Sequence, residues 1–487
     1  MTINLEDSNL FREQGFINGS WTSADNEKTY SVINPSSQEE LTRVPNMGAA
    51  ETLAAINAAH DALPSWGALT AKQRAARLRA WYDLMLQNQD DLARLMTAEQ
   101  GKPLAEAKGE VIYGASFVEW FAEEGKRIYG DVIPTHAEGK RIVTLKQPIG
   151  VVAAITPWNF PIAMITRKVA PALAAGCTVV VKPGEDTPLS ALALAELSLR
   201  AGLPKGVFNV ITTQQAPEVG KVLCEDSRVR KLSFTGSTPV GKLLMRQCAD
   251  TVKKVSLELG GNAPFIVFDD ADLDAAVVGA MASKFRNAGQ TCVCTNRILV
   301  QDGVHDAFVQ KLTAAVQSLT LGDGFAEGVT TGPLINAKAV EKVERLVDDA
   351  IAHGASIIQN TRSEGLGSNF YSPAVLTGVA PDMAIAGEEI FGPVATVIRF
   401  TDEAEAVQIA NDTPFGLAAY FYARDIGRIW RVAEALEYGM VGINEGIIST
   451  EVAPFGGVKE SGIGREGSKY GIEEFLEIKY LCMGGLG

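Results

Sequence analysis

The sequence predicts an α/β protein built from more than one domain, for three reasons. From residue 150 onward, short runs of apolar and β-branched residues alternate with helical segments rich in alanine and leucine. This alternation is typical of parallel sheets that helices cover on both faces. A chain of 487 residues is also too long for one ordinary core, so two or three domains are expected. Finally, two β-rich segments, 128–148 and 475–483, stand outside the alternation and indicate exposed strands that contact another subunit.

The predicted elements follow in order along the chain. Residues 51–100 are predicted to be helical, because apolar residues recur at three- and four-residue spacing with few breakers. The strands and helices that then alternate are predicted at 150–155, 162–175, 178–181, 189–201, 207–211, 216–224 and 231–234. A second α/β stretch is predicted over about 264–394, with buried strands at 265–268 and 298–300. Segments with candidate catalytic residues flank this second stretch, so we expect a site between the domains.

The composition excludes several classes of function. A formal net charge of -14 leaves no basic surface of the kind that nucleic acids require. No apolar run is long enough to span a bilayer, and the polar, acidic start does not resemble a secretory signal. The six scattered cysteines indicate a reducing cytoplasm rather than a disulfide framework. The four histidines and the Cys292–Cys294 pair lack the spacing of a metal site, so none is predicted.

Cys292 and Glu258 are the most informative residues, because together they indicate covalent catalysis. Cys292 lies in Gly-Gln-Thr-Cys-Val-Cys and Glu258 in Leu-Glu-Leu-Gly-Gly. A thiol becomes a strong nucleophile where its surroundings favour the thiolate. A carboxylate in the same pocket can then activate the water that releases the intermediate. A free cysteine is more often a buried structural residue, so the prediction depends on the motifs around it.

A glycine-containing loop follows one predicted strand and opens a helix. Its sequence, Phe234-Thr235-Gly236-Ser237, allows a ligand to approach the backbone, and Ser237 can either cap the helix or meet a phosphate. The string resembles a nucleoside triphosphate loop, but position 243 is Leu where magnesium binding requires Ser or Thr. A G-x-G-x-x-G dinucleotide fingerprint is also missing, so any nicotinamide cofactor must be held in another way.

Two further loops follow predicted strands. Lys182 and Glu185 come just after a buried strand, where they can either hold the two hydroxyls of a ribose or form a solvated turn. In Thr-Pro-Trp-Asn-Phe-Pro, residues 156–161, two prolines fix an aromatic pair and Asn159. A side-chain amide held in this way is a good oxyanion donor, although a plain structural turn remains an alternative.

Together these segments resemble the NAD(P)-dependent aldehyde dehydrogenase superfamily over nearly the whole chain. The motifs that carry the resemblance are 156–161, 182–185, 234–237, 257–261, 289–292 and 389–393. The resemblance implies a parallel-sheet cofactor domain formed by 1–127 and 149–257, and an α/β catalytic domain formed by 258–453. It also implies a small β oligomerisation element with the C-terminal tail, 128–148 and 454–487. A homodimer or homotetramer is expected, without nucleic-acid or membrane partners.

The resemblance also implies a role for each residue. Cys292 would be the nucleophile and Glu258 the general base, and Asn159 would stabilise the oxyanion. The residues implied in cofactor binding are Thr156, Trp158, Lys182, Glu185, Phe234, Gly236, Ser237, Gly260, Glu389 and Phe391. NAD is expected to be preferred because Glu185 would repel a 2′-phosphate. Lys182 partly offsets this repulsion, so use of NADP stays open.

Within the superfamily, the strings 164–168, 284–287 and 444–449 are most similar to those of succinate-semialdehyde dehydrogenases. In that group Arg167, Arg286 and Ser449 would bind the substrate carboxylate, and Cys294 resembles the partner cysteine of a redox-sensitive disulfide. The predicted reaction is oxidation of succinate semialdehyde to succinate through a thiohemiacetal and a thioester on Cys292. Glutarate semialdehyde, 2-oxoglutarate semialdehyde and sulfonated aldehydes such as sulfolactaldehyde suit the same arginines and stay open.

Two other classes of function stay open, and a third is disfavoured. A phosphate-transfer enzyme and a non-catalytic structural relative stay as alternatives. Transfer of the acyl group to coenzyme A is disfavoured by Glu258, because that route avoids water.

Overall fold

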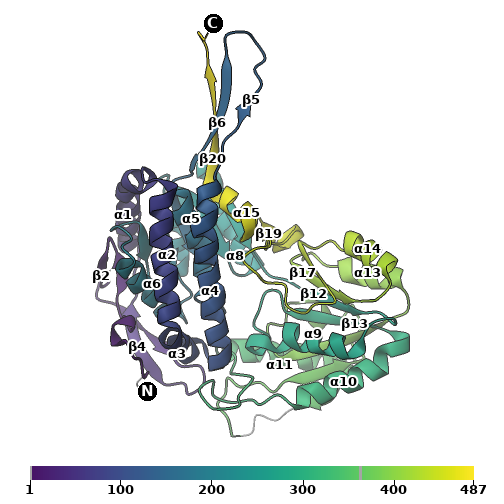
Figure 1. Ribbon diagram of the computed structural model, residues 1–487. Helices are drawn as coiled ribbons and strands as arrows, with labels where there is room; N and C mark the ends of the chain where they lie inside the picture. Colours follow the sequence, from purple (N-terminus) through teal and green to yellow (C-terminus); the bar gives the residue numbers. More distant parts are fainter. Residues whose placement is uncertain (1–2, 361–364, 487) are drawn as a thin grey trace.

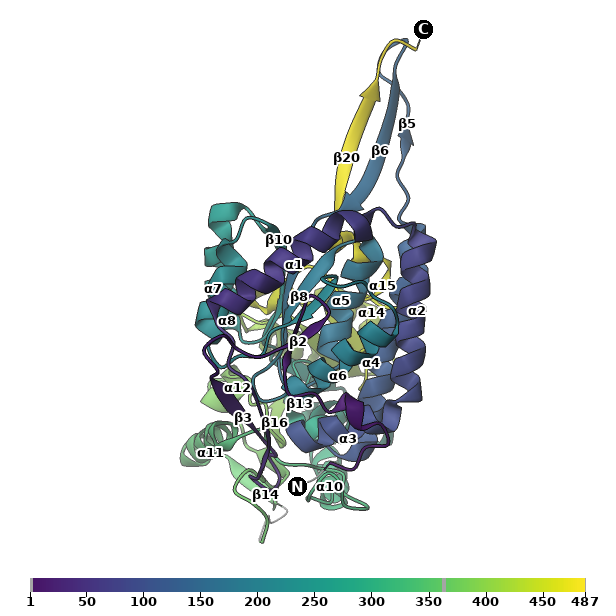
Figure 2. The same cartoon turned by 90° about the vertical axis from the view of Figure 1, so that its left-hand side faces the viewer.

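The computed structural model describes residues 3–360 and 365–486. The chain forms two α/β units side by side, and a narrow three-stranded arm projects from the first unit (Figure 1). Turned by 90°, the same view shows the arm standing clear of the helices, with the C-terminus near its tip (Figure 2). Within the described ranges, none of the helices has the length and apolar character of a membrane span.

The first unit is an eight-stranded sheet in the order β19-β11-β10-β7-β8-β9-β1-β2. Five neighbouring strands in its middle, from β11 to β9, run parallel, while β1 and β19 pair antiparallel at the two sides. The strands are β1 (Gly15–Ile17), β2 (Ser20–Thr22), β7 (Val151–Ile155), β8 (Thr178–Lys182), β9 (Phe208–Val210), β10 (Val229–Thr235), β11 (Lys254–Glu258) and β19 (Gly462–Ile463).

Helices cover both faces of this sheet because successive residues of its strands point to opposite sides. Val152 and Ala154 of β7 belong to one core, and Val151 and Ala153 belong to the other. The helices are α1 (Ala49–Gly67), α2 (Ala71–Gln87), α3 (Gln89–Gln100), α4 (Leu104–Glu124), α5 (Ala163–Ala175), α6 (Pro188–Arg200), α7 (Ala216–Glu225) and α8 (Thr238–Cys248). The predicted alternation of strands and helices in this region is confirmed.

The second unit is a seven-stranded sheet in the order β14-β15-β16-β13-β12-β17-β18, parallel except for β14. Its strands are β12 (Ala263–Val267), β13 (Thr295–Gln301), β14 (Ser356–Asn360), β15 (Ala374–Thr377), β16 (Val394–Phe400), β17 (Ala418–Tyr422) and β18 (Met440–Ile443). Its helices are α9 (Leu273–Phe285), α10 (His305–Gln317), α11 (Ala337–Ala352), α12 (Ala384–Gly387), α13 (Glu403–Asn411) and α14 (Ile426–Ala435). The predicted limit of this stretch near residue 394 was wrong, since β17 and β18 extend the sheet to Ile443.

The arm is a small antiparallel sheet of β5 (Val132–Ile133), β6 (Arg141–Pro148) and β20 (Leu476–Met483). β20 pairs with β6 along its whole length, from Leu476 opposite Pro148 to Met483 opposite Arg141. Both predicted β-rich segments are therefore strands, and they pair with each other. A separate hairpin of β3 (Thr29–Ile33) and β4 (Glu40–Pro45) and the short helix α15 (Ser468–Gly471) complete the fold.

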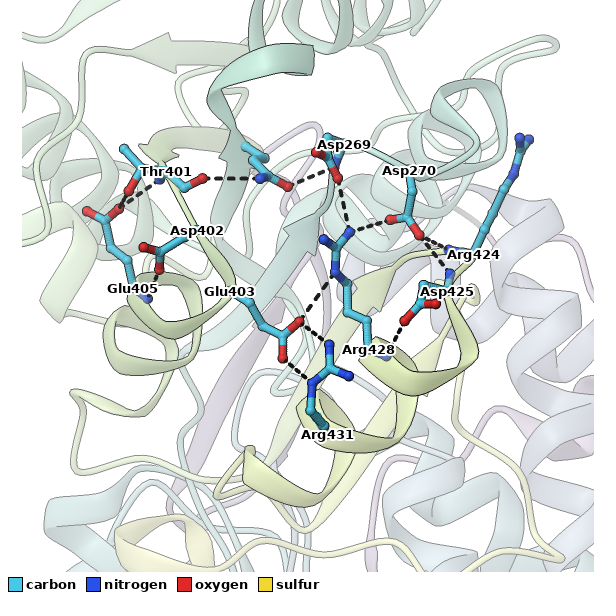
Figure 3. Close-up of polar contacts among 11 residues, drawn as sticks. Asp269, Asp270, Thr401, Asp402, Glu403, Glu405, Arg424, Asp425, Arg428 and Arg431 are labelled. Carbon is cyan, nitrogen blue, oxygen red and sulfur yellow. Dashed lines mark hydrogen bonds and ion pairs between the residues drawn. The ribbon is translucent and has the colours of Figure 1, made fainter.

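A network of ion pairs closes the end of the second sheet where β12, β16 and β17 finish (Figure 3). Arg428 of α14 lies at its centre and donates to Asp269 at 3.0 Å and to Asp270 at 2.7 Å. Glu403 at the start of α13 accepts two hydrogen bonds of 2.8 Å from Arg431. The network thus joins the loop after β12 to the two helices that flank this end of the sheet.

Candidate active site

Four of the predicted loops meet because they follow neighbouring strands of the first sheet. Ile155 of β7 pairs in register with Lys182 of β8 and with Phe234 of β10. One position later, Thr235 pairs with Glu258 of β11. Since the carboxyl ends of parallel strands share one edge of a sheet, the loops after these residues collect along that edge.

The second sheet faces this edge with the amino ends of its strands. Cys292 precedes β13 and Glu389 precedes β16, and these two strands are neighbours. Two buried asparagines fix the loops between them. Asn296 donates to Asn262 Oδ1 at 2.8 Å, and its own Oδ1 accepts the N–H of Ile390 at 2.9 Å. Residues from both halves of the sequence are therefore held around one interface.

A cavity of about 300 Å³ lies at this interface, and we call it the wide cavity. It is lined by Pro157, Trp158, Asn159, Thr235, Gly236, Ser237, Leu259, Gly260, Cys292, Ile335, Asn336, Ala339, Lys342, Glu389, Ile390 and Phe391. Eight of the predicted residues are among them. Asn336, Ala339 and Lys342, from the start of α11, were not predicted, because no local motif marks this helix as part of a site.

Four residues predicted to bind the cofactor are not in the lining of the wide cavity. Lys182 is buried and forms a 2.9 Å ion pair with Glu185, which is exposed. Thr156 donates its backbone N–H to the carbonyl of Lys182 at 3.0 Å. Phe234 lies directly beneath Gly236, where an added Cβ would come within 2.5 Å of its ring. These residues support the cavity wall or extend the site beyond it.

Two features suit the wide cavity to an anionic group and a flat ring. Ser237 is the N-cap residue of α8, yet among the described residues its side chain makes no capping hydrogen bond, so of the two alternatives the capping one is not supported. The N-terminus of this helix therefore offers free N–H groups and a hydroxyl to an anion. Trp158 and Phe391 meet edge to face with ring centroids 5.7 Å apart. Phe391 has a φ of +58°, which a bulky residue adopts only where the surrounding fold holds it.

Glu389 supplies a carboxylate to the wall of the wide cavity. Its Oε1 accepts the backbone N–H of Gly261 at 3.1 Å, which anchors the side chain across the interface. A Cβ added at Gly260 would lie 3.2 Å from Glu389 Oε2, so the glycine keeps the space beside the carboxylate open. Burial raises the pKa of Glu389 to about 7. Its carboxylate can accept a hydrogen bond from a ligand that binds at this wall of the cavity.

Cys292 lies where the wide cavity meets a second one. The second, which we call the narrow cavity, measures about 20 Å³ and is lined by Tyr113, Phe160, Met164, Arg167, Arg286, Thr291, Cys292, Val293, Ser449 and Phe455. Burial raises the pKa of the Cys292 thiol to about 12, and the charge of Arg167 opposes this rise. The resting thiol is therefore protonated at neutral pH.

Asn159 lines the wide cavity beside Cys292. Its Nδ2 donates one hydrogen bond of 3.0 Å to the carbonyl of Gln290. An amide Nδ2 carries two hydrogens, so the second remains for another acceptor. The carbonyl of Asn159 accepts from Lys102 at 2.8 Å and from Asn287 at 3.0 Å, which fixes the loop that carries it.

Glu258 ends β11 and is almost fully buried. Burial, reinforced by the nearby carboxylate of Glu466, raises the pKa of Glu258 well above its usual range. Within the described residues its Oε2 has no hydrogen-bond partner. Glu466 itself forms ion pairs with Lys168 and, at 2.7 Å, with Arg167. Sequence reasoning missed Glu466, because it comes from a loop far along the chain that only the tertiary fold brings to Glu258.

The two arginines of the narrow cavity differ in their partners. Arg167 is paired with Glu466, and its guanidinium lies 3.8 Å from the ring centroid of Phe455. The pair with Glu466 gives Arg167 a structural partner, and its role in binding a substrate stays a prediction. Arg286, in contrast, has no direct ion pair in the described part of the chain, although its charge interacts with the carboxylate of Glu106. The buried Nε of each arginine lacks a hydrogen-bond partner among the described residues. Arg286 thus presents a guanidinium without a direct ion pair to the narrow cavity.

Cys294 occupies a different environment from Cys292. Its buried thiol donates to the carbonyls of Lys284 and Thr295, each at 3.4 Å, and it is not in the lining of either cavity. A disulfide with Cys292 would require the loop between them to rearrange. Among the residues that the structure describes, no cluster of three or more His, Cys, Asp or Glu side chains is arranged to hold a metal ion.

Comparison with known proteins gives consistent matches over the whole chain. The profile of the Aldehyde dehydrogenase family matches residues 21–481. The chain is 64% identical to the glutarate-semialdehyde dehydrogenase of Pseudomonas aeruginosa, covering 99% of this chain and 100% of that protein. It is also 64% identical to a succinate-semialdehyde dehydrogenase [NADP(+)] of Escherichia coli, with coverage of 99% and 100%. A crystal structure of succinate-semialdehyde dehydrogenase from Burkholderia pseudomallei matches with a TM-score of 0.98 and 62% identity, covering 99% of this chain and 100% of that one. The predicted α/β fold class is confirmed.

Proposed function

This chain belongs to the aldehyde dehydrogenase family, and we propose that its substrate is a short aldehyde with an anionic far end. The chain is an enzyme of the class that oxidises aldehydes with NAD(P). One observation carries the proposal: the thiol of Cys292 lines two cavities at once. The wide cavity offers a helix N-terminus and an acceptor carboxylate, and the narrow cavity offers the unpaired charge of Arg286.

A nicotinamide dinucleotide fits the groups around the wide cavity. Ser237 and the N-terminus of α8 would hold the pyrophosphate, and Glu389 would accept a hydrogen bond from a ribose hydroxyl. When bound there, the cofactor supplies a hydride acceptor and a positive charge that favours the thiolate of Cys292. Lys182 and Glu185 lie along the same sheet edge, and we propose that they hold the second ribose.

The chain's own residues then carry out the covalent steps. Cys292 gives its thiol proton to solvent as its Sγ bonds to the aldehyde carbon. The carbonyl oxygen becomes an oxyanion, which accepts hydrogen bonds from the free hydrogen of Asn159 Nδ2 and from the backbone N–H of Cys292. Loss of hydride from this adduct leaves a thioester on Cys292. Glu258, whose raised pKa makes it a stronger base than an ordinary carboxylate, removes a proton from the water that hydrolyses the thioester.

The narrow cavity favours a slender substrate with a negative end. Arg286 offers paired donors to a carboxylate, and Ser449 adds a hydroxyl. The protein carries a net charge of -14, so an anionic substrate needs such a local cation. Relatives are named for succinate and glutarate semialdehydes, and succinate semialdehyde is our preferred substrate. Glutarate semialdehyde, 2-oxoglutarate semialdehyde and sulfolactaldehyde are alternatives, because arginine also binds a longer carboxylate or a sulfonate.

Replacing Arg286 with Ala tests this proposal. Removing one partner of a desolvated charge pair costs about 2–5 kcal/mol, so kcat/KM for succinate semialdehyde should fall at least about 30-fold. The value for butanal, which lacks the charge, should change little. Steady-state formation of NADH with each aldehyde measures both. Equal losses on the two aldehydes would mean that Arg286 supports the loop instead, and a wild-type preference for butanal would remove the anionic substrate altogether.

We also propose that the arm joins subunits into a homodimer or homotetramer. Several apolar side chains on it are exposed in the single chain, among them Val132 (79%) and Ile478 (68%). Contact with another subunit would bury them and would satisfy the open strand edges. Light scattering of the purified protein checks this, and a monomer would contradict it. A cytoplasmic location stays a prediction.

A further inference from the structure

Besides Arg167, whose Nε also lacks a hydrogen-bond partner but whose charge is paired with Glu466, three residues around the narrow cavity carry unpaired polar groups. Within the described residues, these groups are the buried hydroxyls of Tyr113 and Thr291 and the buried Nε of Arg286. Buried polar groups almost always find partners. When several unpaired groups gather around a single cavity, a ligand with oxygen acceptors is the natural partner. The three groups therefore mark the place where the far end of the substrate binds.

Arg286 and Ser449 alone leave part of a bound anion without donors. A carboxylate has two oxygens and about four acceptor sites, and the charge of Arg167 is already balanced by Glu466 at 2.7 Å. A further donor is therefore needed from the wall of the narrow cavity. Tyr113, in the middle of α4, supplies one.

The ring of Tyr113 is held in place by packing. It meets Phe117, one helical turn further along α4, edge to face with ring centroids 5.1 Å apart. Burial raises the pKa of Tyr113, while the charges of Arg167 and Arg286 oppose the rise. The hydroxyl therefore stays protonated and can donate a hydrogen bond close to the charges of both arginines. Because the ring is already fixed, binding a ligand adds no conformational cost for this side chain.

We infer that the Tyr113 hydroxyl determines specificity by donating a hydrogen bond to the anionic end of the substrate, together with Arg286 and Ser449. This inference rests on the proposed function. An alkyl end accepts no hydrogen bond, so an uncharged aldehyde gains nothing from Tyr113. The hydroxyl thus distinguishes a semialdehyde acid from an alkyl aldehyde of the same length.

Tyr113→Phe tests the inference, since it removes one oxygen atom that has no protein partner to lose. A hydrogen bond to a charged group contributes enough that its loss should lower kcat/KM for succinate semialdehyde about 10- to 100-fold. The value for butanal should stay within about twofold. The inhibition constant of succinate, measured in competition with the aldehyde, should rise by a similar factor. That second readout reports binding without the chemical step. Tyr82→Phe, at a half-buried tyrosine of α2 outside both cavities, is the matched control and should change neither value.

Arg286→Ala, measured in parallel, separates this inference from the proposed function. If Arg286→Ala discriminates between the two aldehydes and Tyr113→Phe does not, the inference is overturned while the anionic substrate stands. If neither variant discriminates, neither residue binds the anionic end and the inference is overturned, whereas a wild-type preference for butanal would remove the anionic substrate as well. Equal losses on both aldehydes in Tyr113→Phe would mean that the hydroxyl acts on the Cys292 thiol, which also overturns the inference. A melting temperature equal to wild type confirms that the variant is folded.

Discussion

Replacing Glu258 with Gln should stop the enzyme after a single turnover without damaging the fold. Glu258 Oε2 has no hydrogen-bond partner among the described residues, so an amide of the same shape loses no contact. The sign of the stability change follows from the raised pKa of Glu258, which burial causes first and Glu466 reinforces. A carboxyl whose pKa is higher in the folded state than in the unfolded state destabilises the fold once the pH exceeds its pKa in the unfolded chain. Above that pH the folded state must either keep the proton or bury a negative charge. At pH 7 the uncharged amide should therefore leave the free energy of unfolding unchanged or increase it.

The kinetic effect of Glu258→Gln should be large and confined to the hydrolytic step. Loss of a positioned base costs about 10²–10⁴-fold in turnover, whereas formation of the thioester on Cys292 does not require it. Rapid mixing with aldehyde and NAD should show a burst of one NADH per active site, followed by a stall. Mass spectrometry of the stalled protein should find the acyl group on the peptide that contains Cys292.

Two results would refute this reasoning. Absence of any burst would mean that Glu258 acts before hydride transfer, for example by deprotonating Cys292. Steady turnover near the wild-type rate would mean that another group activates the water. A large drop in melting temperature, in turn, would contradict the view that the carboxyl has no structural partner.

Three other predictions concern the cofactor, the thiol and its neighbour. Partial desolvation raises the pKa of Glu185, but the ion pair with Lys182 more than offsets this and leaves the pKa lowered. The ionised carboxylate should therefore favour NAD over NADP in kcat/KM, and Glu185→Gln should shift this ratio about tenfold toward NADP. A wild-type preference for NADP would refute the assignment. Because the pKa of Cys292 is raised to about 12, alkylation of the free enzyme by iodoacetamide should accelerate about tenfold per pH unit up to at least about pH 9. A plateau near neutral pH would contradict this. Peroxide should inactivate reversibly through a strained disulfide between Cys292 and Cys294, and Cys294→Ala should lose the recovery with dithiothreitol. Equal recovery in both proteins would exclude the disulfide.

The parts of the fold that local sequence determines were predicted well. The strands around Val151–Ile155 and Thr178–Lys182 are apolar, β-branched and flanked by helix formers, and they lie where the alternation predicted them. The loops after them were recognised as site candidates because ligands bind beyond the carboxyl ends of parallel strands. The extent of the second sheet was underestimated, since β17 and β18 follow irregular segments that interrupt the pattern.

The rest of the site depends on contacts between distant segments, which no single sequence motif records. Glu466 reaches Glu258 only because β19 pairs with β11. Lys342 enters the wide cavity from α11, whose sequence reads as an ordinary amphipathic helix. The difference between the paired Arg167 and the unpaired Arg286 could not be read from spacing either, because it follows from which side chains the fold places beside them.

The late position of β19 and β20 has a consequence for synthesis on the ribosome. β19 covers the open edge of β11, and β20 forms one side of the arm, yet both follow their partner strands β11 and β6 at a long distance in the sequence. While the polypeptide is still growing, the first sheet has an exposed edge, β6 has no long partner, and Glu258 lacks Glu466. A nascent chain that stalls or ends early would keep these edges free to pair with other chains. Synthesis of β19 and β20 therefore completes both the edge of the first sheet and the surroundings of Glu258.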